Sequence, residues 1–215
     1  MNELSTVKTL CILRLSALGD ATHVLPLIRT LQKNLPDLKI TWILGVGEAK
    51  LMHGLENVEL IAFNKKSGLK GVKQLAQQLS GRRFDVLLQM QLALRANLIS
   101  AVIPAKRRIG YDTKRAKEGH GLFINERIVH KHHHVLDVFG LFAEPLGFSQ
   151  TEVVWNMPVS EQDHIWASEQ WPAGLPCLLI SPCSSHALRN WLPERYAAVA
   201  NYAQSKGWQV VICGG

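Results

Sequence analysis

The sequence lacks long apolar runs, internal repeats and any clustering of its few cysteines. No run reaches the roughly 18 residues that a bilayer-spanning helix needs, and the first residues lack the basic-then-apolar pattern of a signal peptide. Cys11, Cys177, Cys183 and Cys213 show no CxxC spacing, and three of them lie in or beside apolar runs, as buried thiols do. We therefore expect a cytoplasmic globular protein without a disulfide framework or a zinc site.

Motifs of nucleic-acid recognition are missing as well. No zinc-finger, RNP-type or basic-zipper pattern is present, and the aromatic residues are mostly scattered. No nucleic-acid partner is expected. The formal net charge of +7 instead favours other anionic partners, namely a membrane surface, phosphorylated glycans or sugar nucleotides, and charge alone does not choose among them.

What the chain does contain is a regular alternation of strand-like apolar runs and segments of helical period. Strands are predicted at 9–15, 40–44, 58–63 and 86–90, with a short strand end at 108–111, and the helical segments include 22–33 and 71–79. This βαβ alternation predicts an α/β fold with a parallel sheet. With 215 residues, 47% of them hydrophobic, the chain is large enough to bury a sizeable core.

A second cycle of the same kind follows a stretch that contains several prolines. Residues 134–146 resemble a helix leading out of the first domain, and the periodicity is lost from 149 to 176 apart from a possible short helix. A strand at 177–181, a loop at 182–191, a helix at 193–206 and a strand at 209–213 are then predicted. We expect a first domain at 1–150, a connection at 151–175 and the start of a second domain at 176–215. One βαβ unit does not cover both faces of a parallel sheet, so the second domain is expected to be incomplete.

The segment from Leu13 to Pro26 carries the clearest functional signal, because an apolar strand runs into a glycine-containing turn and then, at Asp20, into an amphipathic helix. Open α/β sheets bind ligands at the carboxyl ends of their strands. Asp20 is either a helix N-cap, worth about 1 kcal/mol, or a general base for an attacking hydroxyl. Gly19 either lets the backbone approach a ligand or adopts a turn conformation barred to other residues. Ser16 either contacts a sugar or closes the turn.

A second polar block, at 184–191, precedes the helix predicted at 193–206. Ser184, Ser185 and Arg189 form a candidate pyrophosphate site, because hydroxyls and a fixed guanidinium oppose the charge that develops on a departing nucleotide. Such a site replaces a metal ion. The alternative is a polar loop with one solvated arginine.

Two basic clusters follow predicted strands. Lys65-Lys66 and the segment 114–117, which holds Arg115 and Lys117, lie in loops that should open at the same end of the sheet as Asp20. Alone, each cluster is more typical of a solvated face than of a binding site.

The histidine-rich segment His130-Lys131-His132-His133-His134 invites a metal interpretation. Adjacent histidines do not easily face one ion, and no nearby carboxylate pattern matches a known site. We expect no metal there.

Taken together, these blocks resemble the glycosyltransferase family that contains the lipopolysaccharide heptosyltransferases, family 9. The resemblance rests on the turn 16–20 with His23 and Pro26, on Arg108-Ile109-Gly110-Tyr111, and on the block 184–191 before a Pro-Glu helix. It extends over essentially the whole chain in the right order. It implies the GT-B architecture of two Rossmann-like domains facing a cleft, with the acceptor-binding half at 1–150 and the opening of the donor-binding half at 176–215.

For function, the resemblance implies inverting, metal-independent transfer of heptose from ADP-heptose to the inner core of lipopolysaccharide, with peripheral contact at the cytoplasmic face of the inner membrane. No cofactor beyond the sugar-nucleotide co-substrate is implied. The implied site comprises Asp20 as general base; Ser16, Gly19, Lys65, Lys66, Arg115 and Lys117 toward the acceptor; and Ser184, Ser185 and Arg189 toward the donor. Family members often carry Thr at the hydroxyl positions and Lys at the cationic one, so Arg189 keeps the charge but alters the geometry.

Two other classes of function remain open. A catalytically silent nucleotide- or glycan-binding module of the same fold would bind ligand even after Asp20→Ala and would never transfer sugar. A nicotinamide-dependent oxidoreductase is disfavoured, because the first turn lacks GxGxxG and no acidic residue marks the end of the second predicted strand. The sequence does not decide whether Kdo or an earlier heptose is the acceptor sugar.

Overall fold

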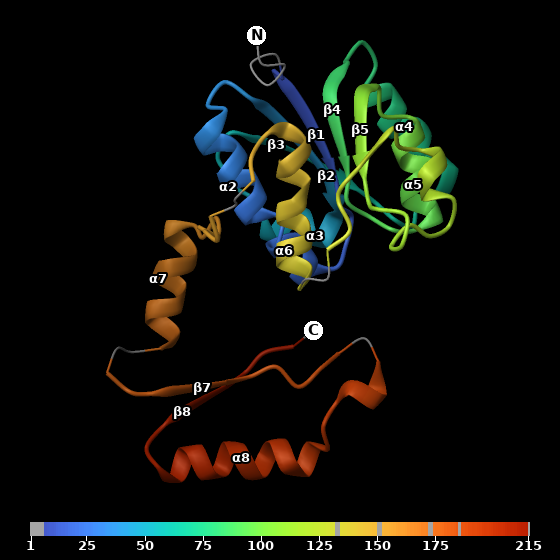
Figure 1. Cartoon of the computed structure of the whole chain (residues 1–215). Helices are drawn as coiled ribbons and strands as arrows, with labels where there is room; N and C mark the ends of the chain where they lie inside the picture. Colours follow the sequence, from blue (N-terminus) through green and yellow to red (C-terminus); the bar gives the residue numbers. More distant parts are fainter. Residues whose placement is uncertain (1–6, 132–133, 150–151, 172–173, 185, 215) are drawn as a thin grey trace. The chain divides into compact units, whose positions relative to one another are not determined.

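The computed structural model describes residues 7–131, 134–149, 152–171, 174–184 and 186–214 (Figure 1). The chain divides into two compact units, Met1–Pro158 and Val159–Gly215. The division falls inside the 151–175 stretch that we expected to connect two domains. Each unit is described by itself.

In the described residues, the first unit is built on a six-stranded sheet with strand order β3-β2-β1-β4-β5-β6, in which all neighbouring strands are parallel. The strands are β1 (Thr9–Leu13), β2 (Lys39–Gly45), β3 (Val58–Phe63), β4 (Phe84–Gln89), β5 (Ala105–Gly110) and β6 (Glu126–Arg127). The predicted α/β fold with a parallel sheet is therefore confirmed. The chain builds outward from β1 to β3 and then resumes at β4 on the other side of β1. The carboxyl ends of β1 and β4 thus flank a topological switch point, where such sheets bind ligands.

Helices connect the strands of this unit. They are α1 (Leu18–Thr22), α2 (Leu25–Asn34), α3 (Val46–Leu51), α4 (Gly68–Gln78), α5 (Leu94–Ala101) and α6 (Val135–Gly140), with short 3-10 helices at His120–Leu122 and Leu141–Leu146. Where a helix was predicted at 22–33, the structure has two helices: α1 ends at Thr22 and α2 begins at Leu25. Pro26, in the first turn of α2, lacks the N–H that a helix continuing from α1 would need. Helices α3 and α5 were not predicted, since both are short and lack a clear apolar stripe.

The central strand β1 is buried on both faces. Leu10 and Ile12 belong to a core with residues of α2, α6 and the 3-10 helix at 141–146. Cys11 and Leu13 belong to a second core, with residues of α4 and α5. Because successive side chains of a strand point to opposite faces, this alternation explains why β1 is a continuous apolar run in the sequence.

The second unit contains α7 (Glu161–Gln170), β7 (Cys177–Ile180), α8 (Pro193–Ser205) and β8 (Gln209–Ile212), with a 3-10 helix at Ala187–Arg189. β7 and β8 pair in parallel, and α8 connects them and packs against both. The two strands and the helix match their predicted positions within two residues. No helix in the described part of the chain has both the length and the apolar character of a membrane span.

The expectation that cysteines beside apolar runs are buried is right for Cys11 and wrong for Cys177 and Cys213. Burial raises the pKa of Cys11 far above that of a free thiol. In β7, the exposed residues Cys177 and Leu179 alternate with less exposed ones, since α8 packs on one face of this two-stranded sheet. Cys213 is exposed directly after β8.

Candidate functional site

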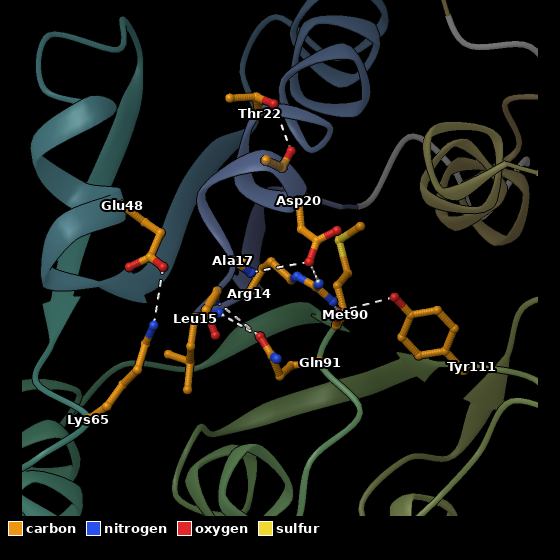
Figure 2. Close-up of polar contacts among 12 residues, drawn as sticks. Arg14, Leu15, Ala17, Asp20, Thr22, Glu48, Lys65, Met90, Gln91 and Tyr111 are labelled. Atoms are coloured by element: carbon orange, nitrogen blue, oxygen red, sulfur yellow. Dashed lines mark hydrogen bonds and ion pairs between the residues drawn. The ribbon is translucent and has the colours of Figure 1, made fainter. Parts of the chain in front are cut away.

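The turn after β1 is held to both neighbouring strands by hydrogen bonds, and Figure 2 shows the contact with Gln91. The side-chain oxygen Oε1 of Gln91, just after β4, accepts from the backbone N–H groups of Leu15 at 3.0 Å and Ser16 at 3.2 Å. On the other side, the N–H of Gly45, the last residue of β2, donates to the carbonyl of Leu15 at 3.0 Å. The peptide bond between Ser16 and Ala17 is cis. These contacts place the turn at the switch point of the sheet.

Asp20 lies in α1, and its carboxylate faces back toward the turn. Its oxygen Oδ2 accepts hydrogen bonds from Arg14 Nη2 at 2.5 Å and from the N–H of Ala17 at 3.1 Å. Among the residues that the structure describes, no donor contacts the other oxygen, Oδ1, and the side chain is 33% exposed. One oxygen of the carboxylate, Oδ2, is therefore fixed by the protein, while the other, Oδ1, is open to a ligand.

The simple N-cap interpretation of Asp20 is wrong in position, because Asp20 is the third residue of α1 and Ala17 is the cap. The carboxylate does accept the N–H of Ala17, so it contributes to capping from inside the first turn. That contact uses Oδ2 alone and leaves Oδ1 accessible.

Arg14 connects the carboxylate to the neighbouring strands. Its side chain is only 11% exposed, and Nη1 donates to the carbonyl of Met90 at 2.5 Å. The guanidinium carbon lies 5.1 Å from the centre of the Phe139 ring, which covers it. Tyr111, just after β5, donates its hydroxyl to the same Met90 carbonyl at 3.2 Å, and burial raises the pKa of Tyr111 to about 12. Tyr111 is thus a neutral donor in this network.

A second buried network holds the end of β5. His120 Nε2 accepts from the N–H of Tyr111 at 3.1 Å, so the proton of the neutral ring is on Nδ1, which donates to Asn97 Oδ1 at 3.0 Å. Gln89 donates to the same Asn97 oxygen at 3.0 Å. Burial and then the charge of Arg127 lower the pKa of His120 to about 4, so the ring is neutral at physiological pH. This network fixes the loop that leads from β5 to the basic segment at 114–117.

The backbone conformation at position 19 does not require a glycine. Gly19 lies within α1 without a positive φ, and a Cβ added there would meet no atom within 4 Å. The turn-conformation alternative is therefore wrong, since any residue adopts this backbone. The other alternative, close approach of a ligand to the backbone, stays a prediction.

Ser16 and Lys65 line one open cavity of about 310 Å³, together with Gln91, Arg95 and Glu118. Lys65 Nζ also pairs with Oε1 of the buried Glu48, at 3.1 Å. Glu48 is in α3, directly after β2. We expected no acidic residue at the end of the second predicted strand, and this expectation overlooked Glu48. The carboxylate of Glu48 is, however, already paired with Lys65.

Gly45 permits this packing. A Cβ there would lie 2.1 Å from Glu48 Oε2, 2.6 Å from the carbonyl oxygen of Leu15 and 2.8 Å from the Cε of Lys65. Only a residue without a side chain lets β2 end this close to the turn and to the Glu48–Lys65 pair.

The other basic candidates differ in how they are held. Lys66 and Lys117 are exposed. Arg115 is partly buried and is fixed by Asp112 at 2.5 Å and by the carbonyl of Lys131. Burial opposes ionisation of Asp112, but hydrogen bonds from Arg115 and His130 outweigh it and lower the pKa of Asp112. Arg115 therefore stabilises its own loop, while Lys66 and Lys117 extend into solvent.

The histidine-rich segment is only partly described, because residues 132 and 133 lie outside the described part. His130 Nδ1 lies 2.9 Å from Asp112 Oδ1, and His134 caps the start of α6. The ring of His134 also lies 5.7 Å from that of His23, which has Trp155 on another side at 6.3 Å. Among the described residues, no group of three His, Cys, Asp or Glu side chains has the arrangement of a metal site.

In the second unit, the candidate donor residues lie on the exposed loop between β7 and α8. The N–H of Ser184 donates to Asn190 Oδ1 at 2.8 Å, and its hydroxyl donates to the carbonyl of His186 at 2.9 Å. Arg189 ends the 3-10 helix and is exposed. Ser185 lies outside the described residues. The described part of this loop thus contains an exposed arginine and a serine whose hydroxyl is already bonded locally.

A sequence model of glycosyltransferase family 9 (heptosyltransferase) matches residues 72–215, which is more than half of the chain. The chain belongs to glycosyltransferase family 9. The lipopolysaccharide core heptosyltransferase OpsX of Haemophilus influenzae is 44% identical over 207 residues, which cover 96% of this chain and 60% of the relative. Lipopolysaccharide heptosyltransferase 3 of Escherichia coli is 24% identical over 220 residues, covering 91% and 60%. The chain thus spans about 60% of the length of these curated relatives.

Solved structures show the same fold. The family 9 glycosyltransferase of Veillonella parvula matches with a TM-score of 0.80 at 21% identity, covering 97% of this chain and 62% of that one. The E. coli heptosyltransferase WaaC with ADP matches with a TM-score of 0.78 at 19% identity, covering 96% and 68%. The resemblance to family 9 inferred from the motifs is confirmed, and so is the α/β fold.

Sequence reasoning missed three residues that the structure brings to the candidate site: Arg14, Glu48 and Gln91. Arg14 carried a detectable signal, because it is a charged residue between two apolar ones at the end of a buried strand. Glu48 and Gln91 carried none that distinguishes them from surface residues. Their contacts join segments that are separate in the chain and come together only at the carboxyl ends of the paired strands.

Proposed function

We propose that the protein transfers heptose from ADP-heptose to a sugar of the lipopolysaccharide inner core, with Asp20 as the general base. The observation that carries this proposal is the Asp20 carboxylate at the switch point, with Oδ2 held by Arg14 and Ala17 and Oδ1 open. The 44% identity to a lipopolysaccharide core heptosyltransferase supports the substrate class.

In the proposed reaction, an acceptor hydroxyl donates its proton to Asp20 Oδ1 as its oxygen attacks the anomeric carbon of the heptose. The bond between that carbon and the pyrophosphate oxygen breaks, and its electron pair leaves with ADP. Attack from the side opposite to ADP inverts the configuration at the anomeric carbon. Arg14 positions the base, because it holds Oδ2 while it is itself anchored on the Met90 carbonyl.

We place the acceptor in the open cavity beside the turn. Ser16 and Lys65 line it, and Gly19, at the start of α1, has no side chain that would block approach. The exposed Lys66 and Lys117 extend the positive charge that phosphates or Kdo carboxylates of the acceptor would meet. Arg115 contributes through its charge and by ordering the loop.

We assign the departing pyrophosphate to the loop of the second unit. Ser184, Ser185 and Arg189 would oppose its growing negative charge by hydrogen bonds and charge, without a metal ion. Nucleotide binding in this family is illustrated by the solved E. coli WaaC with ADP. We also place the protein at the cytoplasmic face of the inner membrane, where a lipid-linked acceptor would be found.

The decisive experiment measures ADP release from ADP-heptose with a deacylated inner-core acceptor. It compares the full-length protein with Asp20→Asn and with Asp37→Asn, a matched change at an exposed aspartate in a turn before β2. Since Asp20→Asn leaves Arg14 without its anion, the double variant Arg14→Gln, Asp20→Asn is included as a neutral pair. Thermal unfolding of each variant reports whether it folds.

Loss of turnover by at least a hundredfold in both Asp20 variants, with unfolding temperatures near that of the parent, would support the general base. Turnover within a few-fold of the parent would remove Asp20 from the mechanism. Ligand binding without transfer by the parent itself would favour a silent binding module of the same fold.

A further inference from the structure

An apolar groove lies on the outer side of the first unit, between α4 and α5. It has a volume of about 470 Å³, and its apolar lining comes from Phe63, Leu69, Val72, Leu94 and Leu98, which we call the leucine groove. Leu69 is 85% exposed, Leu94 51% and Leu98 49%. Figure 1 shows α4 and α5 on the same side of the sheet. Three exposed leucines that meet in one hollow are unusual on a surface that faces only water.

Most of the charged residues around this groove are basic. Residues 64–78, which form α4 and the loop before it, contain four lysines and no acidic residue. The acidic neighbours of the groove are Glu48, which pairs with Lys65, and Glu118, which accepts the N–H of Leu94. Lys66, Lys70 and Lys73 are exposed on α4 and the loop before it. Arg95 lines the groove from α5, and its Nη1 donates to the carbonyl of Lys65 at 3.0 Å. The groove is thus an apolar centre with a cationic border.

The groove is continuous with the proposed acceptor cavity. Lys65, Leu94 and Arg95 line both hollows, and the acceptor cavity reaches Ser16 in the turn that precedes Asp20. A surface that docked on the leucine groove would therefore be adjacent to the acceptor site.

We propose that the leucine groove and its cationic border dock the first unit onto an anionic phospholipid bilayer. Leu69, Leu94 and Leu98 enter the interface between head groups and acyl chains, and the surrounding lysines contact the phosphates. A second copy of the chain fits less well, because a two-fold contact through this face would bring the cationic border of one copy against that of the other. This inference rests on the proposed function for its purpose, since it delivers a lipid-linked acceptor to the cavity that Ser16 and Lys65 line.

The experiment is sedimentation of the full-length protein with phosphatidylcholine vesicles, with and without phosphatidylglycerol. The test variants are Leu69→Ser, Leu98→Ser in one protein and Lys70→Gln, Lys73→Gln in another. The matched controls are Leu122→Ser, at another exposed leucine, and Lys8→Gln, Lys39→Gln, at exposed lysines beside the opposite ends of β1 and β2. Thermal unfolding checks that each variant is folded.

We expect binding to the anionic vesicles that weakens with salt and falls roughly tenfold or more in either test variant, with the controls unchanged. Transfer to the deacylated, water-soluble acceptor should stay at the parent rate in both test variants. The proposal is overturned if the parent does not bind anionic vesicles, binds neutral ones equally well, or binds unchanged in the test variants. A change of oligomeric state in the leucine variant, seen by sedimentation velocity, would assign the groove to a second copy instead.

The two proposals fail separately. If the parent transfers no heptose but binds vesicles through the groove, the proposed reaction is wrong and the docking surface stands. If the parent transfers heptose to the soluble acceptor but does not bind the vesicles, the docking inference is wrong and the proposed reaction stands.

Discussion

Arg14 Nη2 lies 2.5 Å from Asp20 Oδ2, across the turn that joins β1 to α1. The same guanidinium donates to the carbonyl of Met90, at the end of β4. Asp20 is therefore oriented by a side chain that is itself anchored on the neighbouring strand. The position of the Asp20 carboxylate therefore depends on the carboxyl ends of β1 and β4 together, and not on the short helix α1 alone.

Arg14→Lys should test this positioning role. The lysine keeps the charge but does not contact Asp20 and the Met90 carbonyl with two separate nitrogens, as the guanidinium does. For the proposed heptose transfer, we expect kcat to fall roughly tenfold, because the proposed base Asp20 loses its orientation, while KM for ADP-heptose stays unchanged. Steady-state kinetics separate these two parameters. A rise in KM alone would indicate a binding role for Arg14.

Gly45→Ala should destabilise the first unit. Its methyl group would lie 2.1 Å from Glu48 Oε2 and 2.6 Å from the backbone oxygen of Leu15, and the backbone contact has little freedom to shift. We expect a loss of about 1–3 kcal/mol in the free energy of unfolding, measured by chemical denaturation.

The matched control is Gly47→Ala in α3, where an added Cβ meets nothing within 4 Å. Alanine favours a helix over glycine by up to about 1 kcal/mol, so this variant should be as stable as the parent or more stable. Equal effects of the two changes would show that the crowding at Gly45 is unimportant.

Gly19→Ala separates a ligand contact from a structural requirement. Because an added Cβ at this position meets no protein atom within 4 Å and Gly19 is helical, folding stability should be unchanged or slightly raised. If the acceptor approaches the backbone here, KM for the acceptor should rise at least several-fold. Unchanged kinetics would exclude Gly19 from the acceptor site.

His120 should make stability depend on pH. Its pKa is lowered to about 4 in the folded protein, against about 6.5 in the unfolded chain. The unfolded state therefore binds more protons between these values, so the contribution of His120 is complete above about pH 6.5 and is lost as the pH falls toward 4. The expected loss over this range is on the order of 2 kcal/mol.

The measurement is the free energy of unfolding from pH 7 to pH 4 for the parent, for His120→Gln and for His53→Gln. His53 is exposed and serves as the control. The slope should flatten in His120→Gln only. A parent slope that persists in His120→Gln would attribute the pH dependence to other groups.

Much of the fold was predictable because its signals are local. Strand β3 matches its predicted bounds, and β7, α8 and β8 lie within two residues of theirs, since apolar runs and helical period are read within a few residues. The break between α1 and α2 was not predicted, although Pro26 stood in the sequence as its cause. Helices α3 and α5 are specified mainly by packing against the sheet, which no short window of sequence contains.

For the candidate site, the sequence by itself determined that a buried strand is followed by a turn at Ser16 and then by a helix that begins near Asp20. It also determined that this strand end meets others in a parallel sheet. Only the tertiary structure decided which oxygen of Asp20 is open and that Arg14 holds the other one. It also decided that Arg115 is committed to Asp112. The physical reason is range: strand and turn formation depend on near neighbours in the chain, whereas hydrogen bonds and ion pairs at a sheet edge depend on distances that exist only after the strands have paired.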